Sequence, residues 1–176
     1  MFKHTSFAAA LLAATLSSAF AGSYYGAISY VDTELDDLDS NGVSLTVGRN
    51  VDYGFLTAIQ LTYADLGDDN FIDDDDGSNN ADTSSIELAA IFSVDYGQFT
   101  PFVSLGYENT DIDVRSNESG ISETIDDDGF FYSVGADYAL NDALGLRLEM
   151  TYDEFTDDLG EDLDVETVRF GVVRQF

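Results

Sequence analysis

A two-residue alternation through residues 130–152 constrains the fold of this chain more than any other feature. Large apolar residues hold one side of it: Phe130, Tyr132, Val134, Ala136, Tyr138, Leu144, Leu146, Leu148, Met150 and Tyr152. The other side carries mainly small residues and opposite charges, among them Asp137, Arg147 and Glu149. Because successive side chains of a strand point to opposite faces, this pattern predicts two strands joined by a turn at Asn141-Asp142. A soluble sheet alternates too, but this polar face is typical of a narrow barrel lumen with lipid on the other side.

The same alternation recurs along the chain and predicts eight strands. Beside the two strands of 130–138 and 144–152, the expected strands lie near 24–31, 43–49, 55–64, 86–94, 99–108 and 168–176. Four long acidic segments, at 32–39, 65–82, 108–128 and 153–166, alternate with three short connections. An even strand number with short turns at one end and long loops at the other is typical of outer-membrane barrels. The predicted fold is all-β: an eight-stranded antiparallel transmembrane β-barrel with short periplasmic turns and long acidic extracellular loops.

Aromatic residues mark the expected edges of the membrane. The steps from Phe55 to Tyr63, from Phe99 to Tyr107 and from Leu144 to Tyr152 have equal length. A tilted strand rises roughly 20 Å over such a step, close to the apolar band of about 25 Å in bacterial barrels. The expected outer girdle is Tyr30, Tyr63, Tyr107 and Tyr152, and the inner girdle is Tyr24, Phe55, Phe99, Tyr138 and Phe176.

The first 21 residues have the features of a secretory signal peptide. A basic start at Lys3 and His4 precedes a short apolar stretch, and Ala19-Phe20-Ala21 forms a cleavage site. Cleavage after Ala21 leaves residues 22–176 as one barrel domain. This part has no apolar run near the ~20 residues of a spanning helix, so a membrane location requires a closed barrel.

Composition excludes several functions. The chain has no Cys, and its only Lys and only His lie within the predicted signal peptide. Nucleophile–base pairs that use His, Cys or Lys are therefore absent from the mature part, and we expect no enzyme. The formal net charge of −29 argues against nucleic-acid binding, which uses basic patches. It favours cations, cationic surfaces or salty water as surroundings.

Charged residues recur on the faces predicted to point inward. They are Glu87, Glu108, Asp137, Arg147, Glu149 and Arg169. An eight-stranded barrel is only wide enough for its own side chains, so these charges are expected to form an ion-paired plug. The alternative is a gated, narrow, cation-preferring pore, which differs in whether the pairs open and admit water.

The acidic segments offer hard oxygen ligands suited to Ca²⁺ or Mg²⁺. The densest run is Asp73, Asp74, Asp75 and Asp76. The calcium-loop pattern D-x-[DN]-x-[DN]-G is not met, because its first position would fall on Ile72 or Thr124. A solvated, self-repelling surface is the simplest interpretation. Weak divalent binding that bridges to lipopolysaccharide phosphates is the alternative, and no other cofactor is expected.

The segment GFFYSVGADYALNDALGLRLEMTYDEF and the terminal Phe176 resemble the small outer-membrane β-barrel family, namely OmpA-like transmembrane domains and OmpX- and opacity-type "porin family" proteins. The resemblance covers residues 23–176. The C-terminal pattern is similar to the signal read by the barrel-assembly machinery: Val168, Phe170, Val172 and Phe176. Arg174 departs from it, since an apolar or aromatic residue is usual there.

The resemblance implies residence in the outer membrane of a Gram-negative bacterium, as a monomer in contact with lipids, lipopolysaccharide and the assembly machinery. Two functions remain open. One is a structural and surface-interaction role that displays acidic loops outside the cell. The other is a narrow porin-type channel for ions or small solutes.

Overall fold

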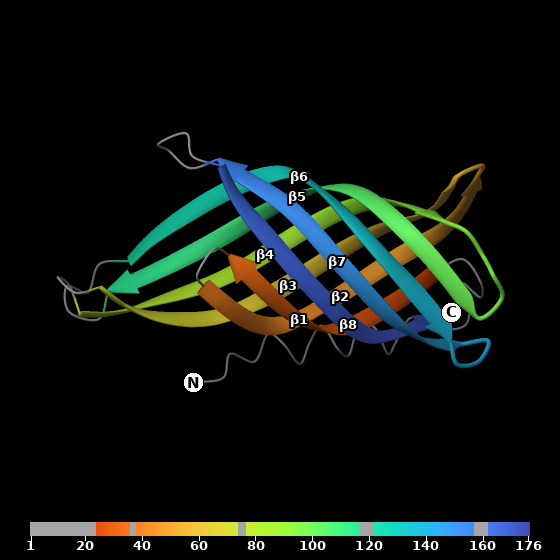
Figure 1. The fold of residues 1–176 in the computed structure, drawn as a ribbon, viewed down its shortest axis with the longest axis horizontal. Coiled ribbons are helices and arrows are strands. Elements are labelled where there is room, and N and C mark those ends of the chain that lie inside the picture. Colours follow the sequence, from red (N-terminus) through yellow and green to blue (C-terminus); the bar gives the residue numbers. More distant parts are fainter. Residues whose placement is uncertain (1–23, 36–37, 74–76, 117–121, 157–161) are drawn as a thin grey trace.

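Eight antiparallel strands close into a barrel in the computed structural model, which describes residues 24–35, 38–73, 77–116, 122–156 and 162–176 (Figure 1). Neighbours in sequence are neighbours in the sheet, and β1 pairs with β8 to close it. The strands are β1 (Tyr24–Leu35), β2 (Leu38–Tyr53), β3 (Leu56–Asp73), β4 (Gly77–Ser93), β5 (Phe99–Ser116), β6 (Ser122–Ala139), β7 (Leu144–Thr156) and β8 (Asp162–Gln175). The predicted eight-stranded antiparallel barrel is confirmed. Nowhere in the described ranges is there a helix long and apolar enough to cross a membrane.

Three tight connections and the closure of the barrel define one end, called here the turn end. At the turn between β6 and β7, the side-chain oxygen of Asn141 accepts hydrogen bonds from the backbone N–H of Ala143 and Leu144, at 3.0 and 3.1 Å. At the turn between β4 and β5, Gly97 has a φ of 80°, which glycine adopts without steric cost. The predicted short turns are therefore present, although β2 continues to Tyr53 through part of the turn expected at 50–54.

The opposite end, called here the hairpin end, differs from the sequence expectation in one respect. Much of the acid-rich sequence expected as loop continues the strands, so that β3, β4, β5 and β6 each have 17 or 18 residues. Strands β1, β7 and β8 have only 12 to 14. In Figure 1 the β3–β4 and β5–β6 hairpins reach well beyond their neighbours. Hydrophobic alternation fades where the strands leave the lipid, so it could not mark these ends.

Side chains alternate between an outer apolar surface and a buried lumen, as predicted. On β8, Phe170 is 55% exposed whereas its neighbours Arg169 and Gly171 are buried. The outward residues include Ile28, Tyr30, Leu88, Leu105, Tyr132, Val134 and Leu148, each at least 44% exposed. Exposed apolar side chains on so many neighbouring strands are typical of the lipid-facing surface of a membrane barrel.

One assignment on β3 was wrong. The alternation from Phe55 to Tyr63 predicts Thr57 on their outward face, but its hydroxyl contacts the backbone oxygen of Ile91 at 3.1 Å and the hydroxyl of Ser93 at 2.8 Å, and it lines the barrel interior. The pairing of β3 with β4 shifts register between Leu56 and Ala58. Such an irregularity inserts an extra residue and breaks the two-residue alternation locally.

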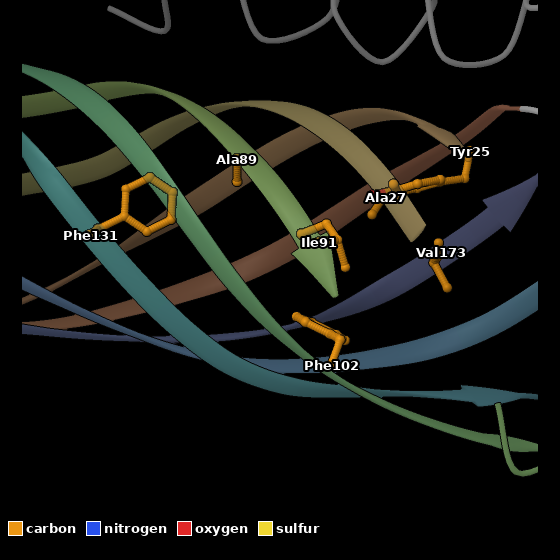
Figure 2. Close-up of a cluster of buried hydrophobic side chains, with 8 residues drawn as sticks. Tyr25, Ala27, Ala89, Ile91, Phe102, Phe131 and Val173 are labelled. Carbon is orange, nitrogen blue, oxygen red and sulfur yellow. The ribbon is translucent and has the colours of Figure 1, made fainter. Parts of the chain in front are cut away.

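Apolar side chains pack inside the turn-end half of the barrel, from Tyr25 and Val173 to Phe131 (Figure 2). Their rings cover glycines on neighbouring strands. The ring of Phe131 lies where a Cβ on Gly106 would stand, and the ring of Phe102 does the same at Gly135. Glycine is needed at these positions because the ring occupies the space of a side chain.

Candidate functional site: the charged lumen

Arg147 forms the charged level nearer the turn end. Its Nε and Nη2 donate to the two carboxylate oxygens of Asp137 at 2.7 and 2.8 Å, and its Nη1 donates to Gln60 Oε1 at 3.0 Å. The hydroxyl of Tyr25 donates to the same Gln60 oxygen at 2.9 Å. The guanidinium also lies 5.1 Å from the ring centre of Tyr25 and 4.9 Å from that of Phe102. The bidentate pairing with Asp137 and the two nearby aromatic rings together hold the guanidinium in one position.

Arg169 forms the second charged level, farther from the turns. Its Nη2 donates to Glu87 Oε1, and its Nη1 donates to the hydroxyl of Thr151 at 3.1 Å. Glu149 faces Arg169 in the pairing of β7 with β8 and accepts a hydrogen bond from Ser133 at 2.7 Å. Glu87 and Arg169 are both almost fully buried, at 1% and 4% exposure. Two charges out of water are stabilised chiefly by each other.

Both arginines reach across the barrel. Arg147 lies on β7 and bonds Gln60 on β3, while Arg169 lies on β8 and bonds Glu87 on β4. In a closed barrel of eight strands, each of these partners is four strands away in either direction. The lumen is therefore crossed from wall to wall at two heights.

Acids outnumber cations in the part of the lumen that the structure describes. Glu108 on β5 and Asp153 on β7 are buried, and Glu87 pairs with Glu108 between β4 and β5. Among described side-chain atoms, Glu87 Oε2, Asp153 Oδ1 and Arg169 Nε are buried without a hydrogen-bond partner in the protein. The level of Arg169 therefore has buried polar atoms that lack hydrogen-bond partners in the protein, whereas Arg147 donates from all three of its nitrogens.

A cavity of about 420 Å³ occupies the turn end of the lumen. Its floor is formed by Arg147, Asp137, Tyr25 and Phe102, and its mouth carries Asn50, Gln98, Asn141, Asp142 and Gln175. Asn50 donates to Gln175 across the mouth at 3.2 Å. The interior is therefore open to solvent from the turns as far as the level of Arg147.

The residues singled out from the sequence have different surroundings. The structure places the six lumen residues on inward faces and groups them into the two levels described above. Asp73 ends β3, its side chain and residues Asp74, Asp75 and Asp76 lie outside the described part, and no metal-binding group of three His, Cys, Asp or Glu occurs within that part. Val168, Phe170 and Val172 are on the outer surface of β8. The guanidinium of Arg174 lies 5.3 Å from the ring centre of Phe176, which accommodates a cation at this rim.

Sequence reasoning missed three members of the network: Gln60, Tyr25 and Asp153. The alternation places Gln60 and Tyr25 inward, but the predicted lumen network contained charged residues alone, and these two side chains are uncharged. Asp153 was assigned to an acidic loop, although it continues the inward series of Glu149 and Thr151 on β7. The alternation of β7, continued past Tyr152 of the outer girdle, places Asp153 on the inward face.

Known proteins share this architecture. The structure is similar to Neisserial surface protein A, with a TM-score of 0.60 and 14% identity over 87% of this chain and 96% of that one. It is similar to Ail, the attachment invasion locus protein of Yersinia pestis, with a TM-score of 0.57 and 15% identity over 88% and 97%. The N-terminal β-barrel domain of Pseudomonas aeruginosa OprF gives 0.53 and 14% over 86% and 97%. At these identities the likeness shows the fold.

The family is established by sequence as well. No curated protein sequence matches the chain significantly. The family described as outer membrane protein beta-barrel domain, however, matches residues 5–176, nearly the whole length. Together with the closed barrel and its apolar outer surface, this match places the chain among proteins of the outer membrane, in contact with its lipids. The chain belongs to the outer membrane protein β-barrel family.

Proposed function

We propose that this protein is a non-enzymatic structural and surface-interaction barrel, with a closed lumen and acid-rich hairpins displayed outside the cell. The observation that carries the proposal is the crossing of the lumen by Arg147 and Arg169, each bonded to a strand on the opposite wall. A conducting path would have to pass both levels. The Glu87–Arg169 pair of the second level is almost fully buried, and breaking such a pair costs about 3–5 kcal/mol.

The surface role is supported by where the charge lies. Most of the 35 acidic residues fall in the four segments at the hairpin end, and the family orientation puts that end outside the cell. Such a surface attracts cationic partners and repels anionic ones. Ail has been solved with the heparin analogue sucrose octasulfate, a polyanion. We expect this chain, at a formal charge of −29, to prefer the opposite kind of surface.

Four finer features belong to the same proposal. Divalent cations would bridge the acidic hairpins to lipopolysaccharide phosphates, because unbridged carboxylates and phosphates repel each other. The C-terminal Val168, Phe170, Val172 and Phe176 would be read by the assembly machinery, and the segment before residue 22 would be removed as a signal peptide. The barrel would act as a monomer.

Binding of outer-membrane vesicles to charged surfaces tests the proposal. Vesicles from a Gram-negative host that expresses the chain should bind polylysine-coated surfaces more than heparin-coated ones, relative to vesicles from the host alone. Replacing Asp74, Asp75 and Asp76 together by Asn should reduce the polylysine binding. The matched control replaces the three turn-end acids Asp52, Asp95 and Asp142 by Asn, and should leave it unchanged. Equal loss in both variants, or a preference for heparin, would contradict the proposal.

A narrow channel for ions or small solutes is the second candidate. The observation that favours it is the turn-end cavity of about 420 Å³, which opens part of the path as far as Arg147. The two candidates differ in whether the levels of Arg147 and Arg169 open, which conductance measures directly.

A further inference from the structure

We propose that the turn-end cavity is a binding site for a small organic cation, namely a molecule with a primary ammonium group and an apolar body of roughly 8–12 heavy atoms. This site is independent of the acidic hairpins, because it lies at the other end of the barrel. In the orientation typical of the family, it opens to the periplasm.

The cavity has the construction of a ligand site. Its volume of about 420 Å³ is within the range of about 300–1,000 Å³ that is common for small-molecule pockets. Apolar side chains from six strands line its walls: Tyr25, Ala58, Ile91, Phe102, Leu144 and Val173. Figure 2 shows Tyr25, Ile91, Phe102 and Val173 around the same interior space. An apolar body would bury its surface against these walls.

Asp137 supplies the specific polar group. Its two carboxylate oxygens each accept one hydrogen bond from Arg147, and its side chain remains 23% exposed. A carboxylate has about four acceptor positions, so about two remain for a donor in the cavity. The walls of the closed barrel fix this carboxylate in place, because Arg147 is itself held by Gln60 and by the rings of Tyr25 and Phe102.

The charge of the lining selects the sign of the ligand. Asp137 and Arg147 neutralise each other, and Asp142 at the mouth adds a further negative charge. Among the described residues that line the cavity, Arg147 is the only cationic one, and three of its nitrogens already donate to protein acceptors. The protein as a whole is strongly acidic. An ammonium ion is therefore attracted and a carboxylate is repelled.

The mouth favours a donor-rich head group in addition. Asn50, Gln98, Asn141 and Gln175 present amide groups around the opening, and Thr57, Ser93 and Thr100 present hydroxyls below them. The side-chain oxygen of Asn141 already accepts two backbone hydrogen bonds, but Gln98 and the hydroxyls provide acceptors without adding positive charge. The cavity thus combines apolar walls, one fixed carboxylate and a neutral polar rim, which is the pattern expected for an amine.

Titration of the refolded full-length barrel tests the inference. The protein is placed in phosphatidylcholine nanodiscs, and amide NMR shifts are followed as 2-phenylethylammonium is added. Two probes of similar shape serve as controls: the anion 3-phenylpropionate and the neutral 2-phenylethanol. We expect saturable shifts at Gln98, Thr100 and Ala139, with the ammonium bound at least about tenfold more tightly than either control, a difference of about 1.4 kcal/mol. Equal affinity for the three probes, or no saturable shifts, would overturn the proposal.

Two variants separate specific binding from partition into lipid. Asp137→Asn removes the carboxylate and frees Arg147, so the preference should reverse toward 3-phenylpropionate. Ala58→Leu fills the wall, where Ala58 is only 5% exposed, and should abolish binding of all probes without changing the charge. Heat-modifiable migration on gels checks that each variant is folded. An unchanged preference in folded Asp137→Asn would refute the site, as would undiminished binding in Ala58→Leu; the second result decides the matter if Asp137→Asn does not fold.

Discussion

The guanidinium of Arg169 on β8 donates a hydrogen bond to the carboxylate of Glu87 on β4, directly across the barrel. Both side chains are buried, and their strands are not neighbours in the sheet. A contact of this kind ties opposite walls together and occupies the middle of the lumen. It combines two roles, because the pair that blocks the path also stabilises the closed barrel.

Glu87→Gln should destabilise the barrel by about 1.5–3 kcal/mol, because it removes the carboxylate to which Arg169 donates and leaves Glu149 as the nearby acid on β7. The free energy of unfolding in a urea titration of the lipid-reconstituted protein measures the effect. Glu108→Gln is the matched control at the paired position on β5. Glu108 takes part in neither of the two ion pairs of the described lumen, so a neutral amide can replace it and the loss should stay below about 1 kcal/mol. Similar losses in both variants would contradict the assigned roles.

Leu146→Arg should cost about 1–2 kcal/mol, because it places a cation on the lipid face close to the inner girdle, where the cost is below the about 2–4 kcal/mol of the midplane. Leu146 alternates with the buried Gly145 and Arg147 and pairs with Tyr138 and Val172. The same unfolding titration measures the change, with Leu146→Val as the control for shape. A cost near zero would mean that this face of β7 does not contact lipid.

Gly106→Ala should destabilise the barrel by about 1–3 kcal/mol, because the added methyl group meets the ring of Phe131 and the backbone oxygen of Leu88. Gly26→Ala is the control, since its Cβ would lie at ordinary contact distances of 3.5 Å from Phe176 and 3.6 Å from the backbone oxygen of Thr46. Unfolding free energies of the two variants are compared. If Gly26→Ala proved the more damaging, the packing of the Phe131 ring would not explain why position 106 requires glycine.

Deletion of residues 73–76 should leave the barrel folded. The pairs of β3 with β4 that belong to the barrel wall run from Leu56 to Asp65, well before the deleted residues. The variant should keep heat-modifiable migration on gels. A variant that migrates as unfolded protein without heating would show that the β3–β4 tip is needed for closure.

The barrel itself could be predicted from the sequence because lipid and a narrow lumen impose opposite demands on alternate residues. Phe170 and Arg169 illustrate this, since neighbouring positions are respectively exposed to lipid and fully enclosed. The ends of β3 to β6 could not be predicted in this way. Outside the lipid both faces of a strand meet water, so the alternation that marks a strand disappears.

The lumen network was only partly predictable for a related reason. Alternation shows which residues point inward, including Glu87 and Arg169, but not their height or partners. The partner of Arg147 across the barrel is Gln60, and that pairing depends on the stagger of β3 against β7, which no local pattern encodes. The bulge that turns Thr57 inward is equally invisible, because it arises from the register of β3 against β4.

Single-channel conductance of the refolded mature protein in a planar lipid bilayer tests the central claim, that the lumen is closed at the levels of Arg147 and Arg169. Folding and insertion are verified in the same preparation by heat-modifiable migration. The expected result is a silent membrane for the wild type, with conductance in Glu87→Gln at most brief. Discrete, cation-selective steps from the wild-type barrel would contradict the account and establish a channel.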